Sequence, residues 1–137
     1  MLNTVQKVKA LKRVPLFEKL TGKERLLIAL ITTEEELAPD SILCEEGESG
    51  DELYLIIEGK ISVERISENG NIEQIASIGA NACVGENSLF VDQPRNATLR
   101  VIEACKVLFL QKILLHELIK DYPQISFGII SSLIQRQ

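Results

Sequence analysis

The sequence predicts a mainly β protein with flanking helices, in which an antiparallel β-roll (a double-stranded β-helix, jelly-roll-like) lies between two helical ends. Residues 34–111 alternate short β-leaning runs with clusters of Gly, Asn, Asp and Pro at hairpin-like intervals. Residues 1–33 and 112–137 instead carry apolar side chains at helical spacing. A chain of 137 residues can bury its apolar side chains in one core, so we expect a single domain.

A first short helix is predicted over residues 5–11. Apolar side chains recur there at helical spacing, at Val5, Val8 and Leu11, with lysines between them. Pro15 then interrupts the pattern, so this helix is expected to be short and amphipathic.

A second helix is predicted to follow Thr21 and to end near Thr33. Thr21 and Glu24 form a Thr-x-x-Glu pattern, which is typical of a helix capping box, shortly before the apolar run at residues 26–31. The acidic run that follows, at residues 34–36, is interpreted as a solvated surface.

Strands are predicted in the middle of the chain, over residues 41–45, 52–58, 60–66, 72–78, 97–103 and 106–111. Between the third and fourth of these runs lies Asn69-Gly70, the dipeptide most typical of a short hairpin turn. We therefore expect those two strands to pair. Glycines at the strand borders favour positive φ or close backbone approach and are interpreted as corners of the roll: Gly47, Gly50, Gly59 and Gly79.

Two helices are predicted after the roll. The first has apolar residues at helical spacing over residues 113–119. Pro123 suits the start of a second helix, and the apolar pattern continues over residues 125–134. The expected order along the chain is therefore helices, β-roll, helices.

The composition limits the function. A formal net charge of -5 and a pI near 5.0 disfavour binding to a nucleic-acid polymer, which usually requires concentrated Lys and Arg. The longest apolar runs are too short to cross a bilayer, so no direct membrane insertion is expected. We therefore expect a soluble, cytoplasmic protein.

The cysteine and histidine content argues against most catalytic centres. Three cysteines stand singly, at Cys44, Cys83 and Cys105, and are interpreted as buried thiols of strands in a reduced compartment. His116 is the only histidine, so the sequence supplies neither a His-based zinc site nor a Ser-His-Asp triad. An enzyme of the metal-dependent jelly-roll type would need several converging ligands. We predict no catalytic residue, no metal ligand and no cofactor.

Residues 84–98 combine groups that suit a small cyclic phosphodiester. Arg95 can donate parallel N–H groups to two phosphate oxygens. Gly85 and Ser88 lie in a predicted short helical turn, where backbone N–H groups and small side chains let an anion approach. A carboxylate accepts hydrogen bonds from sugar hydroxyls, so Glu86 suits a ribose.

The same charged residues have an alternative interpretation. Arg95 and Glu86 could form an ion pair that only stabilises the turn, and exposed pairs contribute about 0–1 kcal/mol. Under the binding interpretation, Arg95→Ala is expected to remove charge-assisted hydrogen bonds to the ligand. We expect that substitution to have little effect on folding, provided that the arginine side chain is otherwise solvated.

Two short motifs frame this candidate site: Val84-Gly85-Glu86-Asn87-Ser88-Leu89 and Pro94-Arg95-Asn96-Ala97-Thr98. Together they are similar to the phosphate-binding cassette Phe-Gly-Glu-Leu-Ala-Leu, short turn, Pro-Arg-Ala-Ala-Thr, at the same Gly-to-Arg spacing. The chain thus resembles the cyclic nucleotide-binding domains of bacterial catabolite activator proteins, kinase regulatory subunits and cyclic nucleotide-gated channels. The glycine-containing segments at residues 46–59 and 78–79 extend the resemblance over nearly the whole chain. We call residues 84–98 the cassette.

The resemblance implies a role for each cassette residue. Glu86 would bind the ribose 2′-hydroxyl and Arg95 the cyclic phosphate, while Gly85 would shape the turn. The remaining phosphate contacts would come from the backbone around Asn87, Ser88 and Ala97.

Departures from the family pattern affect the identity of the ligand. Val84 replaces an aromatic residue, Asn81 a glycine, Asn87 a leucine and Asn96 an alanine. In parts of the family a polar residue beside the cassette arginine accompanies guanine preference, so Asn96 could favour cyclic GMP. The resemblance leaves both cyclic AMP and cyclic GMP open as ligands.

The resemblance implies a regulatory binding module rather than an enzyme. Ligand occupancy would act through the terminal helices on an effector domain or partner protein outside this chain, and a homodimer is also open. The alternative is a ligand-free member of the fold that serves as an interaction or dimerisation domain. Aromatic residues that could be taken for base-stacking groups are interpreted as core side chains: Tyr54, Phe90, Phe109 and Phe127.

Overall fold

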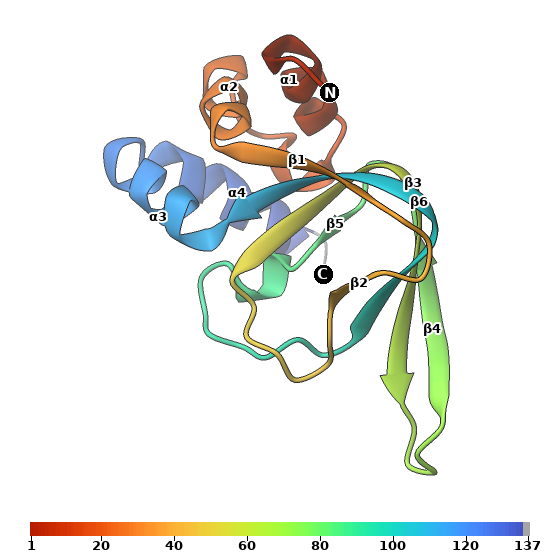
Figure 1. The fold of residues 1–137 in the computed structure, drawn as a ribbon. Helices are drawn as coiled ribbons and strands as arrows, with labels where there is room; N and C mark the ends of the chain where they lie inside the picture. Colours follow the sequence, from red (N-terminus) through yellow and green to blue (C-terminus); the bar gives the residue numbers. More distant parts are fainter. Residues whose placement is uncertain (136–137) are drawn as a thin grey trace.

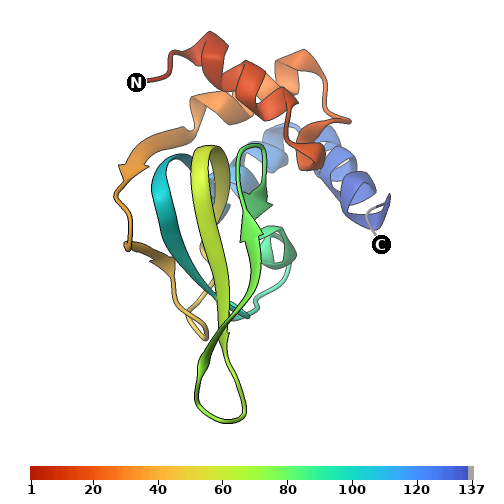
Figure 2. The same cartoon turned by 90° about the vertical axis from the view of Figure 1, so that its right-hand side faces the viewer.

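Most of the helices and the long hairpin lie at opposite ends of the molecule. In the computed structural model, which describes residues 1–135, the helices gather at one end of a curved antiparallel sheet (Figure 1). A long hairpin projects from the other end (Figure 2). The predicted class, an antiparallel β-roll with flanking helices, is confirmed. Within the described residues no helix is both long enough and apolar enough to cross a membrane.

The helical residues form α1 (Thr4–Lys12), the 3-10 helix η1 (Pro15–Phe17), α2 (Gly22–Leu30), α3 (Lys112–Asp121) and α4 (Gln124–Gln135). The capping box predicted for α2 is confirmed. The Thr21 hydroxyl accepts a hydrogen bond from the Glu24 N–H at 3.1 Å, and the Glu24 carboxylate accepts one from the Thr21 N–H at 2.8 Å. Asn3 and Gln6 cap α1 in the same way.

The strands of the sheet are β1 (Thr32–Leu37), β2 (Ile42–Cys44), β3 (Glu52–Ile66), β4 (Ile72–Ile78), β5 (Cys83–Val84) and β6 (Thr98–Gln111). Their order is β1-β6-β3-β4, while β2 also pairs with β6 and β5 with β3. The predicted Asn69-Gly70 hairpin is confirmed, because β3 and β4 pair antiparallel next to this turn, with Ile66 opposite Ile72.

In β3 and again in β6, one continuous strand stands where the sequence predicts two. The register between β3 and β6 shifts near Glu58 and Lys60, so β3 bends without ending. Gly59 lies at this bend with a φ of 105°, and a Cβ there would lie 2.5 Å from the Ala104 carbonyl oxygen. The predicted strand border at Gly59 is wrong, because a glycine with positive φ suits a bulge within a strand as well as the end of a strand.

β1 is a strand that the sequence analysis does not predict. α2 ends at Leu30 rather than near Thr33, and β1 then pairs with β6 along its whole length. The acidic residues of β1 are exposed or half-buried, as expected for a solvated surface, and Glu34 accepts a hydrogen bond from the Leu2 N–H at 2.5 Å. A strand at the sheet edge needs few apolar residues, so its charged run hides the strand pattern.

The apolar core has two parts. One part joins the helices to the adjacent end of the sheet and includes Leu11, Phe17, Ile28, Leu53, Leu108 and Leu115. The other part fills the roll and includes Tyr54, Ile56, Ile61, Leu99, Val101 and Val107. The roll therefore has its own packed interior, and the cassette lies against it.

The predicted positions of the aromatic residues are right for two of them and wrong for two. Tyr54 is buried, and Phe109 packs edge-on against it with ring centroids 5.2 Å apart. Phe90 and Phe127 are 39% and 62% exposed, so their assignment to the core is wrong. Phe90 lies in the loop before β6, and Phe127 lies on the face of α4 that points away from the core.

Candidate ligand-binding site

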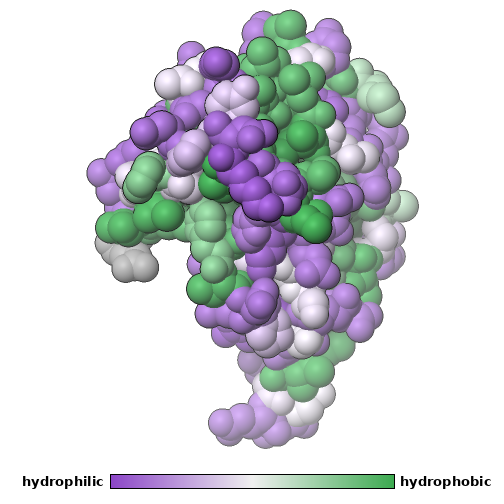
Figure 3. Space-filling model, turned by 90° about the vertical axis from the view of Figure 1, so that its left-hand side faces the viewer, coloured by the Kyte–Doolittle hydropathy of each residue, from purple (hydrophilic) through white to green (hydrophobic). Residues whose placement is uncertain are grey.

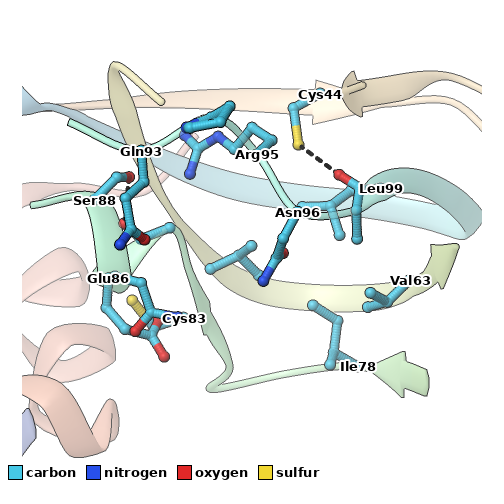
Figure 4. A pocket seen from close by; sticks show the side chains of 15 residues that line it. Cys44, Val63, Ile78, Cys83, Glu86, Ser88, Gln93, Arg95, Asn96 and Leu99 are labelled. Atoms are coloured by element: carbon cyan, nitrogen blue, oxygen red, sulfur yellow. Dashed lines mark hydrogen bonds between the residues drawn. The ribbon is translucent and has the colours of Figure 1, made fainter. Parts of the chain in front are cut away.

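The predicted site residues meet at one cavity. It has a volume of about 220 Å³ and lies between the cassette and the roll (Figure 4). Every residue predicted to bind the ligand lines it: Gly85, Glu86, Asn87, Ser88, Arg95, Asn96 and Ala97. The residues that the two cassette motifs single out in the sequence therefore lie around one cavity in the structure.

Apolar side chains of the roll form the opposite wall. β3 contributes Val63, β4 contributes Ile78 and β6 contributes Leu99, together with the thiols of Cys44 and Cys83 (Figure 4). The sequence alone does not assign these residues to the site. Strand alternation could mark several of them as inward-facing, but which of them border the cavity depends on how the strands pair.

The cassette begins with a tight turn. Gly85 has a φ of 99°, in the left-handed region that favours glycine, and the 3-10 helix η2 (Glu86–Ser88) follows it. Ser88 is buried, and its hydroxyl donates a hydrogen bond to the Gly85 carbonyl at 3.0 Å. Glu86 is half-buried and Asn87 is exposed. The predicted short helical turn is thus present.

Arg95 is anchored through both its backbone and its side chain. Its N–H donates to the Glu48 carbonyl and its carbonyl accepts from the Gly47 N–H, both at 2.7 Å. The residue is only 8% exposed. Its Nη2 donates to the Glu52 carbonyl, and its guanidinium lies 5.2 Å from the centre of the Tyr54 ring. The arginine is therefore part of the packed structure.

The guanidinium of Arg95 keeps donor capacity beside the cavity. Its Nε is buried and has no hydrogen-bond partner within residues 1–135. A buried cation with unused N–H groups is unfavourable until an acceptor completes its surroundings. Figure 4 shows Glu86 apart from Arg95, so a direct ion pair between them does not account for the turn.

Two titratable side chains beside Arg95, those of Cys44 and Tyr54, are affected by burial. Burial raises the pKa of the Cys44 thiol, and the Arg95 charge opposes that shift. Burial also raises the pKa of the Tyr54 hydroxyl, again against the influence of Arg95. Both groups are therefore neutral at pH 7, so neither cancels the attraction of Arg95 for an anion.

The end of the first cassette motif and the loop after it are tied to α3. The His116 Nε2–H donates to the Leu89 carbonyl at 2.6 Å. Lys112 Nζ donates to the Val91 carbonyl at 3.4 Å and forms an ion pair with Asp92 at 3.1 Å. In the sequence, His116 stands out only as an isolated histidine and Lys112 does not stand out, because no local pattern links these distant segments.

The arrangement suits a small anionic ligand that also has a sugar and an apolar part. A cation and a helical turn lie on the cassette side, apolar side chains lie on the roll side, and a half-buried carboxylate lies at the turn. Within residues 1–135 no group of three or more His, Cys, Asp or Glu side chains is placed to hold a metal ion.

The sequence matches the model of a known protein family over the residues that form this site. The sequence model of the cyclic nucleotide-binding domain matches residues 34–122. The chain belongs to the cyclic nucleotide-binding domain family. The match includes the entire cassette and reaches to the end of α3, so the resemblance stated from the two motifs is confirmed.

Proteins similar to this cyclic nucleotide-binding domain include regulators and a channel. The crystal structure of the N-terminal domain of a transcriptional regulator from Streptomyces coelicolor A3(2) has a TM-score of 0.85 and 31% identity, covering 93% of this chain and 91% of that chain. A CRP-like cAMP-activated global transcriptional regulator from Mycobacterium tuberculosis is 32% identical over 91 residues, and potassium channel AKT2 from Oryza sativa subsp. japonica is 28% identical over 128 residues. These two matches cover 66% and 92% of this chain but 41% and 15% of the relatives.

Proposed function

We propose that residues 1–137 form one domain that binds cyclic AMP or cyclic GMP in this cavity and acts as a regulatory module rather than an enzyme. The observation that carries the proposal is the buried Arg95 guanidinium, which keeps donor capacity beside the Gly85 turn. In this proposal the cyclic phosphate binds Arg95 and the backbone N–H groups around Asn87, Ser88 and Ala97. The membership in the family supports this assignment.

The sugar and the base follow from the position of the phosphate. The Glu86 carboxylate accepts a hydrogen bond from the ribose 2′-hydroxyl. The purine then lies against the apolar wall that includes Val63 and Leu99. The exposed Asn96 lies at the edge of the cavity, where its carboxamide can both donate to and accept from a guanine edge. We therefore propose that Asn96 contributes to a preference for cyclic GMP.

Calorimetry with purified protein tests the proposal directly. We expect saturable binding of cyclic AMP and of cyclic GMP, and much weaker binding of 5′-AMP, which lacks the cyclic phosphate. The ratio of the two affinities ranks the bases, and Asn96→Ala is expected to weaken cyclic GMP binding more than cyclic AMP binding. Absence of both heat and thermal stabilisation at millimolar cyclic nucleotide would contradict ligand binding.

We also propose that the signal leaves the cavity through α3 and α4. The end of the first cassette motif and the loop after it are tied to α3 by Lys112 and His116, and α4 follows α3 in the chain. Ligand binding shifts the helices only if the affinity differs between their arrangements. The effector then lies in a domain or partner protein outside this chain, in a cytoplasmic setting, with a homodimer as one form of such a partner.

Hydrogen exchange measures this coupling. Saturating cyclic nucleotide is expected to change the exchange rates of amides in α3 and α4 as well as in the cassette. Lys112→Met removes the side-chain ties to Val91 and Asp92, so we expect it to reduce the change in α4. Lys120→Met is the matched control, because that lysine of α3 pairs with Glu117 of the same helix. Ligand binding without any change in α4 would contradict the proposed route.

A ligand-free interaction domain is the alternative function. α4 exposes Phe127 and Ile134, at 62% and 64%, and exposed apolar side chains on one helix suit a protein partner or a second copy. Light scattering beside the calorimetry separates the two functions. A dimer that takes up neither cyclic nucleotide favours the alternative, and saturable binding favours the sensor.

A further inference from the structure

The charges of the chain are divided between its two ends. Residues 1–30 contain seven Lys and Arg against two Asp and Glu, which gives a net charge of +5. Residues 31–137 contain eight Lys and Arg against eighteen Asp and Glu, which gives -10. The first segment forms α1 and α2, which pack on each other at the helical end of the molecule (Figure 1). An acidic protein thus presents one basic pair of helices.

Three basic residues of this segment lie on the solvent-facing side of α1 and its C-cap. Lys9, Lys12 and Arg13 follow Val5 at spacings that place all four on one face of the helix. All four are exposed, and Val5 is 64% exposed. Within residues 1–135 no ion pair involves these three cations, although the chain contains twenty acidic residues. Their charge is therefore available to an external anion.

α2 also exposes apolar side chains at the helical end of the molecule. Leu26 and Leu30 lie one turn apart on α2 and are 40% and 62% exposed. Figure 3, seen from the side of α2 and α3, shows hydrophobic side chains beside hydrophilic ones over the helical end. Aliphatic side chains among lysines on a helix are typical of helices that lie on a membrane surface.

We propose that the α1–α2 pair is a docking surface for an anionic lipid membrane. Charge complementarity selects an anionic partner, and the exposed valine and leucines add apolar area that can enter the headgroup region. A specific acidic protein partner would be expected to meet aromatic or arginine anchors in a complementary pocket. The exposed faces of this pair offer mainly lysines and short aliphatic chains on convex helices, which suit a planar surface better.

This surface is separate from the proposed cyclic nucleotide site. None of the residues that line the cavity belongs to α1 or α2. Docking through the helices would also keep the roll at a distance from an anionic membrane. This orientation is favourable because the acidic roll and the membrane repel each other. Lipid binding therefore does not depend on the function proposed above, and either proposal can fail without the other.

Vesicle co-sedimentation tests the proposal with two charge-matched variants. We expect the full chain to bind phosphatidylcholine vesicles that contain about 30% phosphatidylserine at about 0.1 M salt, and not to bind pure phosphatidylcholine. The double variant Lys9→Glu/Lys12→Glu is expected to bind at least about 25-fold more weakly, from about fivefold for each lysine. Lys60→Glu/Lys106→Glu makes the same change in net charge on the roll and is expected to bind within about threefold of wild type.

Leu26→Ser/Leu30→Ser separates a lipid surface from an acidic polymer. We expect this variant to bind the anionic vesicles more weakly but to keep the weak, salt-sensitive binding of the wild type to polyglutamate, since only lipid takes up apolar side chains. Circular dichroism and thermal unfolding confirm that each variant is folded. The proposal would be overturned if the helix and roll charge variants lost vesicle binding equally, or if the wild type did not bind vesicles. Tighter binding of the wild type to polyglutamate than to vesicles would also overturn it.

Discussion

Replacing Arg95 with alanine is expected to lower the affinity for cyclic nucleotide by about 10²–10⁴-fold, because two charge-assisted hydrogen bonds of about 1.5–3 kcal/mol each are lost. The remaining cavity keeps its apolar wall and the turn at Gly85, so weak binding can persist. Calorimetry with the ligand that binds wild type more tightly measures the loss.

The same substitution is expected to lower the free energy of unfolding by about 1–3 kcal/mol. From the sequence, little effect on folding is expected provided that the side chain is solvated, but Arg95 is only 8% exposed. Alanine deprives the Glu52 carbonyl of its side-chain donor and removes the cation above the Tyr54 ring. Urea unfolding monitored by circular dichroism measures this second effect separately from binding.

Two further variants isolate the role of Arg95. Arg100 is a matched arginine of β6 that pairs with Glu64 at 3.2 Å, and Arg100→Ala is expected to change stability by only about 0–1 kcal/mol and leave the affinity unchanged. Arg95→Lys keeps the charge but not the parallel donors, so an intermediate affinity is expected. If Arg95→Ala binds as tightly as wild type, the phosphate assignment is wrong.

The cassette could be predicted from the sequence because its chemistry is local. Gly85 and Arg95 are separated by a short loop, and the spacing between them is visible without knowledge of the fold. The structure brings the predicted residues to one cavity. The hairpin at Asn69-Gly70 is local in the same sense, because the residues of the turn between Ile66 and Ile72 are consecutive in the sequence.

Other parts of the site depend on contacts between distant segments. Val63 and Leu99 are opposite each other in the pairing of β3 with β6, and no local pattern says that this pair borders a cavity. The charge of Arg95 suggests a solvated side chain, and only the fold shows that the Glu52 carbonyl and the Tyr54 ring enclose it. β1 is hidden for a related reason, because pairing at the sheet edge makes it a strand while its side chains stay polar.

Replacing Gly85 with alanine is expected to have an effect comparable to the loss of Arg95, although it removes no functional group. At a φ of 99° a Cβ introduces backbone strain of about 1–2 kcal/mol. The new methyl would also lie 2.5 Å from Arg95 Nη1 and 2.8 Å from the Glu52 carbonyl oxygen. These groups form the contact that anchors the guanidinium, so the arginine must move. We expect unfolding to be easier by about 2–4 kcal/mol in total and the affinity to fall by about 10²-fold.

Gly70 provides the matched control for this substitution. Its φ of 83° is also in the left-handed region, but a Cβ built there meets nothing within 4 Å. Gly70→Ala therefore introduces backbone strain alone. Its free energy of unfolding is expected to fall by about 1–2 kcal/mol, with no change in affinity for the cyclic nucleotide. The difference between the two variants in urea unfolding measures the displacement of Arg95, and calorimetry shows whether that displacement reaches the ligand. Equal losses of stability together with wild-type affinity in both variants would mean that Gly85 does not set the position of Arg95, and a phosphate held by that guanidinium would then need another support.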